Sequence, residues 1–169
     1  KINMALVKGP FTLKWGSNTL TNVGEMSMNY DIESSDFKTV DGRTFKIEGA
    51  HSASVEVKLL ESDVAAIRTI LPQYYVAKNA KLSTGQTVNN DAGAIDIVAA
   101  KCDTATTNYD LDIISCNGQV TRLVNARTAL STNEFEDNVL RTVTVTFTAE
   151  PRAGQAALQF FGDGHLTPA

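Results

Sequence analysis

One stretch of the chain constrains the fold more than any other, because its alternation of apolar and polar residues runs too far for a strand buried in a small domain. Residues 44–60 read TFKIEGAHSASVEVKLL. The period of two predicts a β-strand with one apolar face. The apolar face would carry Phe45, Ile47, Ala53, Val55, Val57 and Leu59, and the polar face Lys46, Glu48, Ser52, Ser54, Glu56 and Lys58. At about 3.3 Å per residue this arm would exceed about 50 Å, against about 20 Å for an ordinary strand.

A glycine and a turn shape this arm. We expect Gly49 to interrupt it with a bulge or a bend. Asp41-Gly42 is a favoured pair for a tight hairpin turn, because both central positions tolerate a positive φ. The outer part of the arm should therefore project beyond the sheet as a hairpin, with the polar stretch 31–38 on its rising side. A projecting hairpin has unpaired edges, and such edges are either protected or used for pairing.

The projecting hairpin is the main candidate for contact with another protein, since it combines apolar and polar side chains near its tip. The predicted contact residues are Glu33, Ser34, Ser35, Asp36, Phe37, Lys38, Val40, Asp41, Gly42 and Arg43. The alternative is a surface hairpin with no partner. Sheet edges joined head to tail between copies would give a ring where the rotation closes and a helical filament where it does not.

The rest of the chain consists mostly of short alternating segments. Strands are predicted at 11–15, 19–21, 25–32, 94–100, 109–116, 119–130 and 156–161, with a hairpin turn at Asn117-Gly118. One helix is predicted from the Ser62-Asp63 cap to the residue before Pro72. We expect a single, mainly β domain over residues 1–169, built as a β-sandwich or distorted barrel with one flanking α-helix and the long projecting hairpin.

A second alternating segment, RTVTVTFTAE at 141–150, places threonines where an open strand would scatter lysine and glutamate. Val143, Val145 and Phe147 are expected to point into the core. The opposite row is Thr142, Thr144, Thr146 and Thr148, a candidate lining for a channel. Hydroxyls are short, hydrated and uncharged, so they would make a polar wall without long side chains in the bore. The alternative is that threonine is simply a good strand residue on an open face.

Composition excludes several function classes. The net charge is −4, so no basic surface is available to neutralise duplex phosphates. No apolar run approaches the roughly 20 residues of a membrane helix, and KINMALVKGP at the start lacks the apolar stretch of a signal peptide. A protein made and kept in the cytoplasm is expected. Cys102 and Cys116 are too few to staple a secreted scaffold, and reduced thiols are the favoured reading.

No motif predicts catalysis, a metal or a cofactor. His51 and His165 have no ligand partners at zinc-site spacing. Asp110 and Asp112 share a strand face, and Glu134, Glu136 and Asp137 cluster in a loop; solvated acids are commoner than catalytic pairs. No nucleophile elbow and no phosphate-binding glycine loop occurs. Trp15 is expected in the core rather than on a sugar-binding platform.

Beyond these patterns, the chain resembles the tail tube proteins of long-tailed bacteriophages. The resemblance spans most of the sequence and rests on five segments: GPFTLKWGSNTLTNVGEMSMNYDIESSDFKTVDGRTFKIEGA, SVEVKLLESDVAAIRTILPQYYV, GAIDIVAAKCD, LDIISCNGQV and LRTVTVTFTAEPRAGQAALQFF. It implies a β-sandwich closing toward a barrel, similar in fold to the type VI secretion tube protein. It also implies rings of six copies, whose inner strands fuse into a continuous channel. Rings would stack through a long loop that corresponds to residues 33–44, and an acidic channel wall would let DNA pass without binding.

The sequence therefore predicts a structural protein of the virion tail, assembled in the host cytoplasm, and not an enzyme. Hexameric rings would stack into a tube that conducts viral DNA into the host, with sheath, tape-measure and baseplate proteins as possible partners. Residues 1–8 and the C-terminal tail are expected to help set the ring register. The runner-up is a carbohydrate-binding β-sandwich from a tail tip, in which Trp15 and exposed tyrosines contact sugar. A hydrolase using His51 and the acids is third.

Overall fold

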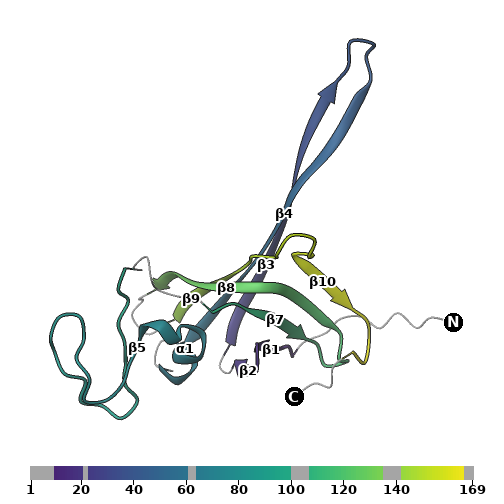
Figure 1. The fold of residues 1–169 in the computed structure, drawn as a ribbon. Coiled ribbons are helices and arrows are strands. Elements are labelled where there is room, and N and C mark those ends of the chain that lie inside the picture. The colour runs from purple at the N-terminus through teal and green to yellow at the C-terminus, as the bar shows by residue number, and fades with distance from the viewer. Residues whose placement is uncertain (1–9, 21–22, 61–63, 100–106, 135–141, 166–169) are drawn as a thin grey trace.

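Ten strands and one α-helix make up the described part of the protein, a computed structural model covering residues 10–20, 23–60, 64–99, 107–134 and 142–165. The elements are β1 (Thr12–Trp15), β2 (Asn18–Leu20), β3 (Val23–Lys38), β4 (Thr44–Leu60), α1 (Val64–Ile70), a 3-10 turn η1 (Pro72–Tyr74), β5 (Tyr75–Val76), β6 (Ala94–Ile95), β7 (Tyr109–Ile114), β8 (Val120–Glu134), β9 (Thr142–Ala149) and β10 (Leu158–Phe161). The predicted fold class, mainly β with one short flanking helix, is confirmed (Figure 1).

Eight of the strands form one antiparallel sheet. Its order is β2-β1-β7-β8-β9-β4-β3, with β10 paired to β8, while β5 and β6 form a separate small sheet. The first half of β8 pairs with β7 and the second half, from Ala126 onward, with β9. The change occurs at Asn125, whose φ is 51° and where β8 has a register shift against β7. β8 thus belongs to two halves of one bent sheet.

The core lies between those two halves. Trp15 from β1 is 1% exposed and contacts Phe147 from β9, with ring centroids 6.2 Å apart. Val55, Val57 and Val145 are fully buried beside them. From α1, Ile67 and the following Leu71 join the same cluster, so the helix closes one side of the core. Burial of these side chains is what holds the halves together.

β3 and β4 extend well beyond this core as a two-stranded ribbon (Figure 1). β4 pairs with β9 only from Leu60 to Ser54, and the rest of β4 pairs with β3 alone. The overlong arm predicted from the sequence is therefore confirmed. Residues 33–38, expected as part of a loop, are the outer end of a strand. All of residues 27–38 and 44–52 are exposed, so the body of this copy covers none of the ribbon.

The predicted interruption near Gly49 is a bulge. Ile32 pairs with His51 but Ser34 with Glu48, so Gly49 and one further residue of β4 face a single residue of β3. One extra residue on a strand moves the following side chains to the other face. Phe45 and Ile47 consequently leave the apolar face of residues 53–59, and the prediction that one apolar face runs along the whole arm is wrong.

Both predicted hairpin turns form, but not as two-residue turns. At the tip, the Thr39 amide donates to Arg43 O at 2.8 Å and the Gly42 amide donates to Thr39 O at 3.1 Å. Gly42 has a φ of 86°, whereas Asp41 is not left-handed. The Asn117-Gly118 turn repeats this pattern, with φ 76° at the glycine alone. Each is a three-residue loop that closes on a left-handed glycine.

Candidate assembly surface

The tip of the ribbon is held by a compact polar network. The Thr39 hydroxyl donates to the Asp41 carboxylate, and Asp41 Oδ2 lies 3.4 Å from Arg43 Nε. The hydrogen bond from Thr39 lowers the pKa of Asp41 below its ordinary value, with a smaller contribution from the Arg43 backbone. The turn that connects β3 to β4 is therefore ordered by its own side chains, without contact from a neighbouring molecule.

Below the tip, the ribbon carries large apolar side chains that its own body leaves open to solvent. Phe37 and Phe45 are direct cross-strand partners, and Ile47 lies on the same face one pair further down. Their exposed fractions are 58%, 52% and 54%, and Val40 at the turn is fully exposed. An exposed apolar cluster on a paired ribbon is typical of a protein contact.

The ten predicted contact residues all lie on this exposed part of the ribbon. They pair across it as Ser34 with Glu48, Ser35 with Ile47, Asp36 with Lys46, Phe37 with Phe45 and Lys38 with Thr44, while Val40 to Arg43 form the turn. Glu33 faces the bulge, where Gly49 approaches its Cβ. The structure thus gathers them at the outer end of the ribbon, on both of its faces, and their role in contact remains a prediction.

Two edges of the sheet are open for backbone pairing. β3 is the last strand of the sheet, so its outer edge has no partner among the described residues. β7 pairs with one edge of β8 only as far as Ala126. Beside residues 127–134, that edge has no strand among the described residues. β3 and the second half of β8 therefore bound a four-stranded section, β8-β9-β4-β3. Unpaired edges of this length are templates for pairing with another chain.

This four-stranded section has a core face, formed by buried residues such as Val55, Val57 and Phe147, and an opposite polar face. Cross-strand register places on the polar face Arg127 and Ala129 of β8, the β9 threonines, Ser54, Glu56 and Lys58 of β4, and Ser27, Asn29 and Asp31 of β3. Lys58 Nζ lies 3.6 Å from Glu25 Oε2. The face is polar and of mixed charge, with acids on both β3 and β4.

The predicted threonine row lies in the middle of this polar face. Thr146 and Thr148 are half-buried, and Thr144 is 8% exposed beside a hollow that Glu25, Glu56 and Lys58 also line. Thr142 begins β9, opposite Leu60, and its side chain lies outside the described set. The opposite row, Val143, Val145 and Phe147, is buried as predicted. Whether the threonines line a channel depends on assembly.

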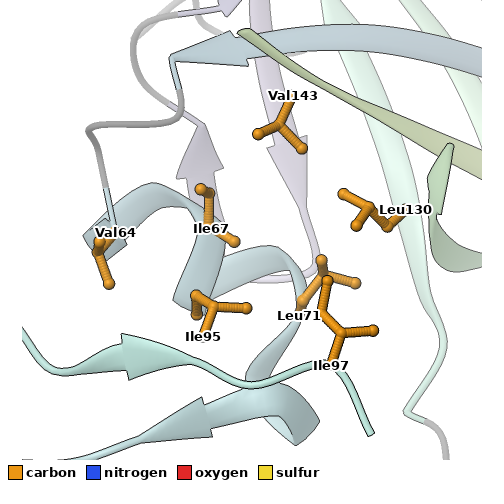
Figure 2. Close-up of a pocket in the computed structure, with 7 residues that line it drawn as sticks. All are labelled: Val64, Ile67, Leu71, Ile95, Ile97, Leu130 and Val143. Atoms are coloured by element: carbon orange, nitrogen blue, oxygen red, sulfur yellow. The ribbon is translucent and has the colours of Figure 1, made fainter. Parts of the chain in front are cut away.

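An apolar pocket of about 250 Å³ lies on the core face between α1 and the sheet (Figure 2). Its lining residues are Val64, Ile67, Leu71, Ile95, Ile97, Leu130 and Val143. Leu130 belongs to the open-edged part of β8, and Val143 pairs with Leu59 at the end of β4 farthest from the hairpin tip. Ile97 remains more than half exposed. The pocket thus borders an open sheet edge.

Residues considered for chemistry have structural partners instead. Arg122 makes two hydrogen bonds to Asp112, at 2.7 and 3.3 Å, and these bonds raise the pKa of the arginine. His51 Nδ1 lies 2.6 Å from the Tyr30 hydroxyl. The burial of Trp15, which donates from Nε1 to Ala126 O at 3.3 Å, contradicts the idea that it contacts sugar.

Other sequence candidates fall partly outside the described residues. Glu136, Asp137 and Cys102 lie outside them, as do residues 1–8 and the last four of the tail, while Cys116 is exposed in its turn. Within the described ranges, no three His, Cys, Asp or Glu side chains are grouped to hold a metal ion. In the same part of the chain, no helix is long and apolar enough to cross a membrane.

Comparison with known proteins shows what fold this is. No protein family and no curated protein matches the chain. Among solved structures, the cap that terminates the anti-feeding prophage tube shares 12% identity with a TM-score of 0.56, over 93% of this chain and 94% of that one. A chain of the sheath–tube complex of the extracellular contractile injection system PVC shares 11% identity with a TM-score of 0.57, over 95% and 93%.

The sheath/tube terminator of the same PVC system shares 13% identity with a TM-score of 0.52, over 96% of this chain and 100% of that one. At these identities the likeness shows the fold alone. The chain has a tail-tube-like fold, shared with proteins of contractile injection systems over almost its whole length.

Proposed function

We propose that the protein is a structural subunit of a viral tail tube. Six copies close into a ring, rings stack into a tube, and the tube conducts viral DNA into the host. The observation that carries this proposal is a four-stranded section of sheet, β8-β9-β4-β3, with both edges open, joined to an exposed ribbon that its own body does not cover. The tail-tube-like fold supports the same role.

Ring closure follows from the direction of the two edge strands. Each neighbouring pair in the section β8-β9-β4-β3 is antiparallel, so β3 and β8 run in opposite directions. A rotation about an axis along the strands keeps their directions, and it brings β3 of one copy beside β8 of the next as an antiparallel pair. Such head-to-tail contacts close into a ring when the rotation divides the full circle.

A ring of six would leave room for a duplex. Four strands from each of six copies give roughly 24 strands at about 4.8 Å spacing, which is a circumference of about 115 Å and a backbone diameter of about 37 Å. Side chains take about 5 Å from each wall, since face-to-face sheets pack about 10 Å apart, and a bore of about 27 Å remains. Strand tilt widens it further.

In this ring the polar face lines the bore, because the core face carries α1 and the other half of the sheet. Thr146 and Thr148 then contribute uncharged hydroxyls, with the buried Thr144 beside them, and the acids Asp31 and Glu56 repel DNA phosphates. Lys58 is paired with Glu25 and Arg127 with Glu150, so neither cation stands without an acid. The lining therefore does not bind the genome it passes.

Ring stacking uses the projecting ribbon. Phe37, Phe45 and Ile47 need cover that a second ring supplies, and burying the remaining exposed half of each side chain contributes about 1 kcal/mol. Sheath, tape-measure and baseplate proteins are further partners in this proposal. The similar PVC chain belongs to a sheath–tube complex, which supports the first of these. The assembled protein would reside in the virion tail.

Negative-stain microscopy and native mass spectrometry of the purified protein test this proposal. We expect rings or tubes about 80 to 100 Å wide, the size of a circle of six such domains, and a hexamer mass. A protein that stays monomeric at every concentration would overturn it.

A further inference from the structure

An exposed apolar pair on β3, Met28 and Tyr30, lies on the opposite face from Phe37, Phe45 and Ile47. Met28 and Tyr30 lie on the core face of β3, where they pair with Val55 and Ala53. Their β4 partners are buried, but Met28 is 45% exposed and Tyr30 43%. The reason is position: β3 is the edge strand, so no further strand of this copy shields these side chains.

The second surface is the pocket beside α1, at the other edge of the same section. Leu130 contributes to it from β8, and Ile97 contributes from the segment after β6 (Figure 2). Leu130 pairs with the buried Val145, so it also lies on the core face. An exposed apolar row and an apolar pocket thus occupy the same face at opposite edges.

We infer that the Met28 side chain of one copy fills the α1 pocket of the next copy, in a register that places Met28 beside Leu130 and Asp31 beside Arg127. This inference rests on the proposed ring. When β3 pairs with β8 of a neighbour, the sheet continues and its core faces stay on one side, so the row and the pocket meet. Methionine suits such a pocket because its flexible thioether fills irregular apolar space.

Charge selects the register. Through the paired strands, Arg127 is level with Thr148, Ser54 and Asn29 within one copy. Shifting the neighbour's β8 by two residues toward the hairpin keeps every side chain on its face and moves Arg127 from Asn29 to Asp31. The same shift places Leu130 beside Met28. Opposite charges facing each other across strands are favourable, and they lie here on the polar face.

The first test replaces side chains on each half of the contact. Met28→Asp and Ile97→Asp place a charge in the apolar contact and are expected to abolish rings, while the exposed positions leave the monomer folded by circular dichroism. Met28→Leu keeps the apolar contact and should form rings. Val98→Asp is the matched control for Ile97, since Val98 is an exposed neighbour that does not line the pocket.

The second test reads the register by disulfide cross-linking in a Cys102→Ser, Cys116→Ser background. Asn29→Cys with Ala129→Cys places cysteines directly opposite across copies, at a Cα separation that a disulfide spans. We expect a ladder of covalent multimers up to six on non-reducing gels. Ser27→Cys with Ala129→Cys would cross-link only in the unshifted register and should give none.

The outcomes separate this inference from the ring itself. Rings from Met28→Asp and Ile97→Asp at the wild-type level, or cross-links from the Ser27 pair alone, would overturn the contact or its register and leave the ring standing. Absence of rings from the unmodified protein would overturn both. Loss of rings in the two aspartate variants, with rings in the two controls and cross-links from the Asn29 pair, is the expected result.

Discussion

Asp110 Oδ1 accepts a hydrogen bond from the Asn125 amide at 2.8 Å, at the point where β8 leaves β7 and begins to pair with β9. Asn125 is left-handed at φ 51°, and its side-chain amide donates to Glu150 O at 2.6 Å. Asparagine tolerates this conformation better than other residues with a Cβ. This contact therefore fixes the bend that lets one sheet enclose the core.

Substitution of Asn125 tests the role of the bend in stability. Asn125→Val is expected to lower the free energy of unfolding by about 2–3 kcal/mol, because a β-branched residue is strained at positive φ and the bond to Glu150 is lost. Asn125→Gly keeps the conformation without strain and should cost about 1 kcal/mol. Urea unfolding measures both. Equal effects of valine and glycine would show that the backbone conformation is not what matters.

Alternation and turn chemistry were enough to predict most of the fold, because they are local. The full extent of β4, from Thr44 to Leu60, follows from period two, and α1 ends at Ile70, just before Pro72. The face on which Phe45 and Ile47 lie was not predictable in this way, since a one-residue bulge depends on the partner strand. The bend at Asn125 gave no glycine or proline signal.

The candidate assembly surface was predictable in part for the same reason. The hairpin residues are contiguous in sequence, so pattern alone located them. The α1 pocket joins residues as distant as Val64 and Val143, and the open edge of β8 is defined by which strands are missing beside it. Both are products of sheet order, which no local pattern encodes.

The tip network predicts a measurable pKa change. The Asp41 carboxylate has a pKa below its ordinary 3.8 because it accepts from the Thr39 hydroxyl. Because the folded pKa is the lower one, ionisation of Asp41 stabilises the turn at pH values above the pKa of the unfolded state. That contribution is lost as the pH falls through the folded pKa. Thr39→Val should therefore raise the Asp41 pKa toward 3.8. NMR titration of the carboxyl carbon measures this pKa. Thr39→Ser keeps a hydroxyl and should leave the pKa low; a raised value in both would contradict this explanation.

Removal of the ribbon tip tests its role in stacking. Deletion of residues 35–43, or the double substitution Phe37→Ser with Phe45→Ser, should leave a folded protein unable to form tubes. The deleted residues are exposed apart from the half-buried Thr39, and none of them belongs to the core. Sedimentation and microscopy would show whether separate rings remain. Tube growth by either variant at the normal rate would refute the role given to the ribbon.

Trp15 provides a test of the bent-sheet core. Trp15→Ala should lower the free energy of unfolding by about 3–5 kcal/mol, because it leaves a large cavity where both halves of the sheet meet. Trp15→Phe loses the hydrogen bond to Ala126 O and part of the side-chain volume, so a smaller decrease in the free energy of unfolding is expected. Chemical denaturation measures both. The exposed Phe160 serves as the comparison, since Phe160→Ala should change stability little.

Charge reversal across the proposed ring contact tests its polar face. Asp31→Arg places two cations opposite each other, and Arg127→Asp places two acids opposite each other. Each variant should weaken the contact by about 1 kcal/mol, or roughly fivefold in the association constant. A closed ring repeats the contact at every junction, so the loss of rings should be much steeper.

The double variant restores opposite charges and should recover rings, although Arg127 also loses its contact with Glu150. Arg152→Asp, an exposed change of the same charge in the loop after β9, is the control. Native mass spectrometry at low ionic strength reads the hexamer fraction, where surface charges are least screened. Failure of the double variant to recover beyond either single one would mean that Asp31 and Arg127 do not meet, because a direct pair must be sensitive to the sign of both partners.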